Sequence, residues 1–88
     1  MVGKSLRARL RAFGSTAKRL RDARGYSQET MAELADLTND RFLRRIERGE
    51  VNVRFSTLCK IAEALEVEPS VLLRRPRKSL SAKTDKRR

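Results

Sequence analysis

Residues 27–47 decide the fold, and they read SQETMAELADLTNDRFLRRIE. The segment opens with Ser27, a residue type that caps helices, followed by apolar residues with helical spacing. Asp36 interrupts this spacing, which resumes after a second capping position. The pattern predicts a helix over about residues 28–35, a tight turn, and a second helix over about residues 39–47.

The second of these helices, capped by Thr38 or Asn39, has two unlike sides. Leu43 and Ile46 mark an apolar side, and four arginines share an arc of about 100° on the opposite side. These arginines are Arg41, Arg44, Arg45 and Arg48. A short helix of this kind fits the major groove of B-DNA, where a guanidinium can bond to guanine or to a phosphate. The same charges also suit a solvated surface, so the helix alone leaves both interpretations open.

Apolar residues with helical spacing continue on both sides of this segment. They run from Leu6 to Leu20 before it, and from Phe55 to Leu65 and from Val71 to Leu73 after it. No alternating pattern typical of a strand is present. The sequence therefore predicts an all-α domain of five short helices over residues 13–73. Because Gly14 and Ser15 weaken the first helix, residues 1–12 form either a basic N-terminal arm or an extension of that helix.

The net charge of +11 is concentrated at the two ends of the chain. Residues 1–12 contain four basic residues and no acidic one, whereas basic and acidic residues are equal in number over residues 13–73. Residues 74–88 contain eight basic residues and one acidic one, with little apolar content. We expect this last stretch to be a disordered tail that either attracts polyanions or aids solubility.

The composition argues against several classes of protein. The chain contains no His and one Cys, so we expect no metal site, no cofactor and no enzymatic activity. No apolar run is long enough to span a membrane, and the first seven residues lack the apolar core of a signal peptide. A lone Cys is typical of a reducing compartment, and we expect the protein to be cytoplasmic.

Three stretches resemble the lambda-repressor/Cro-like (XRE-type) helix-turn-helix family. They are RDARGYSQETMA at residues 21–32, RRIERGE at residues 44–50, and the apolar pattern over residues 58–73. The resemblance covers about residues 13–73 and implies a lambda-repressor-like fold that binds double-stranded DNA. Such proteins are encoded by bacteria or phages and associate with the nucleoid when bound to DNA.

The resemblance, together with the arginine face, assigns roles to individual residues. Arg21 and Glu47 match an internal ion pair of the family. Candidates for contacts to bases are Asn39, Asp40, Arg41, Arg44 and Arg45. Candidates for contacts to phosphates are Gln28, Arg48, Asn52 and Arg54. Two choices stay open: Asp40 either accepts a hydrogen bond from cytosine or caps the helix, and Asn52 and Arg54 either contact phosphate or form an ordinary loop.

One departure from the family affects the helix that carries the arginines. The chain is one residue longer than the usual spacing between Ala32 and Ile46, and the extra residue falls within residues 36–41. Asp36 also stands where the family commonly has Gly. The register of residues 39–41 is therefore open, whereas Arg44 and Arg45 are placed by counting back from Ile46.

The function expected from these features is regulation of transcription. A domain of this size contacts few base pairs, so we expect a homodimer on a palindromic operator, with two helices in successive major grooves ~34 Å apart. The expected dimer interface consists of Val67, Val71, Leu72 and Leu73. The dimer would act as a repressor or controller of its own or neighbouring genes. The alternative is a DNA-binding antitoxin whose main partner is a toxin protein, and the sequence does not choose between them.

Overall fold

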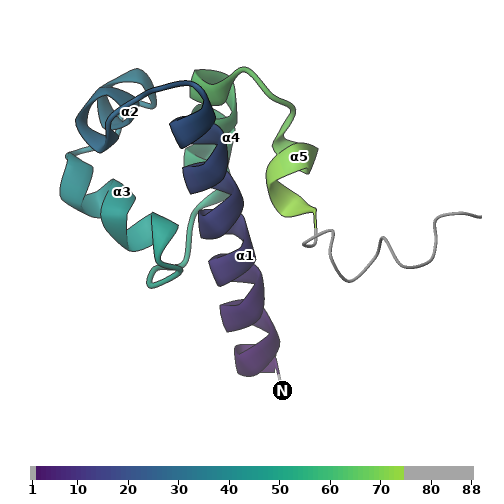
Figure 1. Ribbon diagram of the computed structural model, residues 1–88. Coiled ribbons are helices and arrows are strands. Elements are labelled where there is room, and N and C mark those ends of the chain that lie inside the picture. The colour runs from purple at the N-terminus through teal and green to yellow at the C-terminus, as the bar shows by residue number, and fades with distance from the viewer. Residues whose placement is uncertain (1, 75–88) are drawn as a thin grey trace, which may run out of the picture.

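The computed structural model describes residues 2–74, which form five helices and no strand. The helices are α1 (Val2–Ala23), α2 (Gln28–Leu34), α3 (Asp40–Glu47), α4 (Phe55–Leu65) and α5 (Pro69–Leu73). The predicted all-α class with five helices is confirmed. Helix α1 passes through the middle of the molecule, with α2 and α3 to one side of it and α5 to the other (Figure 1). Residues 2–12 are part of α1, and the predicted tail over residues 74–88 lies, apart from Arg74, outside the described residues.

The ends of the helices follow local capping. The Ser27 hydroxyl accepts a hydrogen bond from the Thr30 amide at 3.0 Å, and α2 begins at the next residue, Gln28. The Asn39 side chain accepts one from the Phe42 amide at 2.9 Å. Asn39 is therefore the cap of α3, which begins one residue later than predicted, and Asp40 does not cap this helix.

The turn between α2 and α3 uses a left-handed residue. Asp36 has a φ of 57°, and the Leu37 amide donates to the Ala32 carbonyl at 2.8 Å. This hydrogen bond is typical of the Schellman motif, in which a helix ends at a left-handed residue that is usually Gly. Asp tolerates the conformation better than most residues because its short polar side chain can bond locally. The turn therefore keeps its geometry although the usual Gly is absent.

The hydrophobic core lies between α1 and the other four helices. Its buried members are Phe13, Ala17, Met31, Ala35, Leu43, Ile46, Leu58, Ile61, Ala62, Leu65 and Leu72. Four large residues of the predicted apolar faces lie outside it: Phe55 is 72% exposed, Leu73 56%, Leu34 52% and Leu6 42%. Phe55, Leu34 and Leu73 stand at helix ends, and Leu6 precedes the part of α1 that the other helices cover. Helical spacing therefore predicted the apolar face of each helix, but not how much of that face the other helices cover.

Leu72 corrects one prediction about assembly. It was expected in the dimer interface with Val67, Val71 and Leu73, but its side chain is completely buried in the core of the single chain. A residue without exposed area in the monomer cannot contribute to an interface with a second copy. Val67 and Val71 are half-buried and Leu73 is exposed, so these three remain available at the surface.

Helices α1 and α3 come unusually close at Gly14. A Cβ atom added there would lie 2.3 Å from the Ile46 carbonyl oxygen and 2.6 Å from that of Glu47. Both are backbone atoms that side-chain rotation cannot move away. The position that weakens α1 in isolation is thus the one at which α3 packs against it.

No helix within residues 2–74 combines the length and the apolar character needed to cross a membrane.

Candidate nucleic-acid interface

The candidate site is built on the two sides of α3. Leu43 and Ile46 are buried and attach the helix to the core. On the other side, Arg41, Arg45 and Arg48 are exposed and Arg44 is half-buried. The division into an apolar and a basic side, expected from the helical projection, is present in the folded chain. The basic side faces outward on a helix whose position the core determines.

A buried ion pair connects α3 to α1. The Arg21 Nε donates to Glu47 Oε2 at 2.7 Å, and its Nη2 donates to Oε1 at 3.2 Å. The Nη1 of Arg21 donates to the Tyr26 carbonyl at 2.8 Å. Hydrogen bonding to Glu47 raises the pKa of the Arg21 guanidinium above its ordinary value, against the opposing effect of burial. Two parallel bonds therefore join the C-terminal end of α3 to α1.

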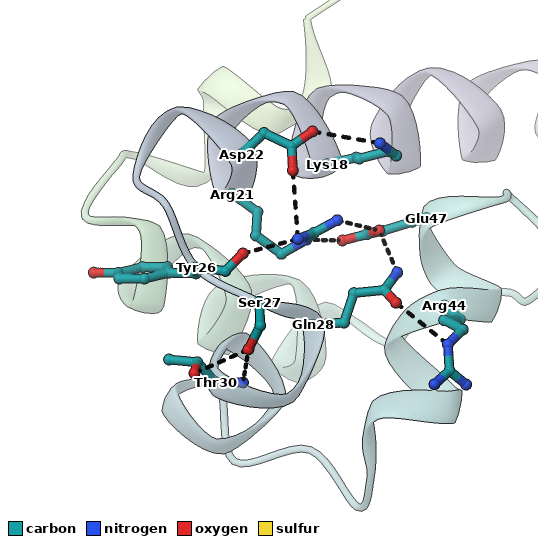
Figure 2. A network of polar contacts seen from close by, with 9 residues as sticks. All are labelled: Lys18, Arg21, Asp22, Tyr26, Ser27, Gln28, Thr30, Arg44 and Glu47. Atoms are coloured by element: carbon teal, nitrogen blue, oxygen red, sulfur yellow. Dashed lines mark hydrogen bonds and ion pairs between the residues drawn. The ribbon is translucent and has the colours of Figure 1, made fainter.

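Gln28 extends this pair to the arginine side of α3 (Figure 2). Its Nε2 donates to Glu47 Oε1 at 2.9 Å, and its Oε1 accepts from Arg44 Nε at 3.2 Å. The side chain expected to contact a phosphate is thus bonded inside the protein, and a phosphate contact would have to replace these bonds. Neither bond was predicted, because the partners of Gln28 lie 19 and 16 residues away in the sequence. No local sequence signal indicates such contacts.

Arg44 has a second partner on its own helix. Its Nη2 lies 2.6 Å from Asp40 Oδ2, one helical turn earlier, and its side chain is 43% exposed. Asp40 and Gln28 together hold the guanidinium from two sides, which lowers its rotational freedom. Asp40, whose register was open, therefore acts in this structure on the side chain of Arg44.

The other candidates for base contacts lie around one hollow beside α3. Asn39, Arg41 and Arg45 line one shallow hollow. Arg41 has no ion-pair partner among the described residues, whereas Arg45 lies 3.8 Å from a Glu50 carboxylate oxygen. An exposed pair at this distance contributes little and is readily exchanged for another anion. Arg41 and Arg45 are therefore the side chains of α3 most free to bind a ligand.

The candidates for phosphate contacts lie in three places. Arg48 and Asn52 line a hollow formed by α1 and the loop that follows α3. Arg48 also lies 3.3 Å from Glu50 Oε2. Arg54 is exposed at the N-terminal boundary of α4. Gln28 is separate from these residues and half-buried within the network described above.

The described residues contain no group of three or more His, Cys, Asp or Glu side chains that could hold a metal ion. The side chains gathered at α3 are cations and amides instead. They are the groups that proteins use to bind phosphates and the edges of bases.

Comparison with known proteins identifies the arrangement. A family model described as helix-turn-helix, HTH_3, matches residues 18–72. The restriction-modification controller protein C.AhdI from Aeromonas hydrophila is 41% identical, with a TM-score of 0.69 over 72% of this chain and 94% of that one. An HTH_3 family transcriptional regulator from Vibrio cholerae is 33% identical, with a TM-score of 0.71 over 76% of this chain and 37% of that one.

A hypothetical transcription factor, NHTF from Neisseria, is 27% identical, with a TM-score of 0.75 over 85% of each chain. No curated protein matches the sequence. The family match extends over α2, the turn and α3, and the arginines of α3 lie on the helix that follows this turn. The resemblance to XRE-type proteins is therefore confirmed, and the chain belongs to the HTH_3 helix-turn-helix family of DNA-binding transcription regulators.

Proposed function

We propose that this protein is a homodimeric regulator that binds a palindromic operator and controls its own or neighbouring genes. The observation that carries the proposal is the basic side of α3, which the buried Arg21–Glu47 pair and the core hold in a fixed orientation. A recognition helix needs this rigidity because a base contact depends on the guanidinium being placed within a fraction of an ångström.

In this proposal α3 enters the major groove with its basic side toward the bases. Arg41 and Arg45 are the free side chains, and each can bond to guanine O6 and N7. Arg44 contributes from a pre-oriented position next to Asp40. Arg48, Asn52 and Arg54 bind the phosphates on the edge of the groove, which orients the helix without reading sequence.

The dimer follows from the size of the domain and from its surface. One α3 helix reads few base pairs, so a second copy on a two-fold axis is needed for a unique site in a genome. Val67, Val71 and the exposed Leu73 are the apolar residues at the α5 end of the molecule that the core leaves accessible. We therefore assign the interface to these three residues, without Leu72.

The identity of 41% to a restriction-modification controller favours a controlling role toward genes next to its own. Within residues 2–74, no contact favours the antitoxin alternative. Repression follows where such a dimer covers the binding site of the polymerase. The bacterial sources of the similar structures also support a bacterial or phage origin and action in the cytoplasm.

The test is a gel-shift titration on the DNA upstream of the protein's own gene, at ~150 mM salt with excess random competitor. We expect a discrete complex, with a footprint of two half-sites about one helical turn apart. Arg45→Ala should weaken this complex by about 1–3 kcal/mol and weaken binding to random DNA less. Arg19→Ala is the matched control, because Arg19 is exposed on the side of α1 away from α3.

Sedimentation without DNA tests the dimer separately. Leu73→Glu should shift the protein toward the monomer, because two-fold symmetry brings the two introduced carboxylates close together. A wild-type monomer at tens of micromolar would contradict the dimer proposal. If random competitor DNA abolished the complex entirely, this result would contradict sequence-specific control of the upstream region.

A further inference from the structure

The N-terminal part of α1, over residues 5–12, contributes no buried side chain to the core. The family model begins at residue 18, and the buried side chains of α1 begin at Phe13. The N-terminal end of the helix extends past the other helices (Figure 1). Within this part Arg7, Arg9 and Arg11 are all exposed, and none has an ion-pair partner among the described residues.

Two of these arginines lie beside the loop that follows α3. Arg7 and Arg11 are four residues apart, so they stand on the same side of α1 about 6 Å from each other along its axis. They line one hollow of about 530 Å³ together with Arg48 and Asn52. The one acidic residue at this hollow is Glu50, whose carboxylate is already paired with Arg48 at 3.3 Å. The polar side chains at the hollow are therefore three cations, one amide and this paired carboxylate, and the rest of its lining is apolar or glycine.

This placement is fixed by close backbone packing. A Cβ atom added at Gly49 would lie 2.6 Å from Arg11 Cγ and 2.7 Å from Arg11 Cα. Gly49 directly follows the C-terminal end of α3, and Gly14 packs against that end one helical turn along α1. The two contacts hold Arg7 and Arg11 at a constant position relative to the arginines of α3.

We propose that Arg7 and Arg11, with Arg48 and Asn52, form a second phosphate-binding surface that holds the DNA backbone next to the half-site bound by α3. This inference rests on the proposed function and extends it. Two neighbouring cations without acidic partners are attracted to a polyanion, and the surface is continuous with Arg48 at the end of the recognition helix. The surface adds affinity and register on the DNA and reads no base.

The test compares two double variants of the full chain with equal loss of charge. Arg7→Gln/Arg11→Gln removes the proposed contacts, and Arg9→Gln/Arg19→Gln removes two exposed charges from the other side of α1. The probe is a duplex selected by the wild-type protein from a random pool, in a short form that ends at the half-sites and a long form with flanking sequence. Binding is measured from 50 to about 300 mM salt, and circular dichroism verifies that both variants fold.

On the long duplex, the dimer carries four of these arginines. We therefore expect Arg7→Gln/Arg11→Gln to lower the slope of log K against log salt by about 3.6 and the affinity at 0.15 M salt by roughly 900-fold. The ratio of affinities for selected and scrambled sequence should stay unchanged, and the control variant should show a much smaller loss. On the short duplex the two variants should differ little from each other.

Equal losses for the two double variants on the long duplex would overturn the inference and leave the proposed function intact. The loss would then come from the overall charge of the protein and not from a localised surface. A loss confined to the selected sequence would also overturn it, because that result assigns base reading to Arg7 or Arg11. Failure of the wild-type protein to enrich any sequence would instead contradict the proposed function.

Discussion

Replacement of Gly14 by Ala tests how the two helices of the site are joined. In an isolated helix this change is stabilising by about 1 kcal/mol, because Ala is the better helix former. In the folded protein the new Cβ atom would lie 2.3 Å from the Ile46 carbonyl oxygen, 2.6 Å from that of Glu47 and 2.8 Å from the Glu47 carbonyl carbon. Ordinary contact begins at 3.4 Å, so α1 and α3 must separate by about 1 Å.

The cost of this separation is expected to exceed the gain in helix propensity. Overpacking of a core typically costs about 1–3 kcal/mol, and here the contacted atoms are backbone atoms of a helix that also holds the Glu47 carboxylate. We expect a net loss of about 2 kcal/mol, which corresponds to a fall in Tm of roughly 8–16 °C for a domain of this size.

The assay is thermal and urea denaturation followed by far-ultraviolet circular dichroism. Ser15→Ala is the matched control, because Ser15 is the next residue of α1 and is exposed, so this change should be neutral or slightly stabilising. Gly14→Ala should also weaken DNA binding more than Ser15→Ala, since it displaces the C-terminal end of α3. A Gly14→Ala protein as stable as the wild type would refute the assigned role of the close approach.

Three further changes probe the network and the turns. Glu47→Gln should destabilise the protein by about 3 kcal/mol in urea denaturation, because it removes the buried counter-ion of Arg21 and leaves only the exposed Asp22 carboxylate at 3.4 Å; a wild-type midpoint would contradict this. Glu66→Gly should stabilise it by about 0.5–1 kcal/mol in the same assay, because Glu66 has a φ of 60°, and Glu63→Gly inside α4 should have the opposite effect. Asp40→Asn removes the partner of Arg44 at 2.6 Å, so binding to random DNA in a gel shift should strengthen by about 5-fold while preference for the operator falls; an unchanged ratio would show that Asp40 does not restrain Arg44.

Predictions that depend on local signals agree closely with the structure. Ser27 caps α2, and α3 starts within one residue of the predicted position. Caps act over three or four residues, so their effect is encoded in a short stretch of chain. The buried and basic sides of α3 are equally local, since the helical repeat alone determines which residues share a side.

Predictions that depend on neighbouring helices agree less well. Leu72 was assigned to a dimer interface and Phe55 to an apolar face, yet Leu72 is buried within the single chain and Phe55 is 72% exposed. Periodicity shows that a helix has an apolar face, but the length of the helix that is covered depends on which other helix packs there. That information is absent from any single stretch of sequence.

The sequence by itself therefore determined the helices, the turn between α2 and α3, and the clustering of arginines on one side of α3, because short-range bonding and the helical repeat control these features. Only the tertiary structure decided that Gln28 bridges Glu47 and Arg44, that α1 meets α3 at Gly14, and that Arg7 and Arg11 lie beside Arg48. These contacts join residues 16 to more than 30 positions apart, and they form because burial of the common core brings the helices together.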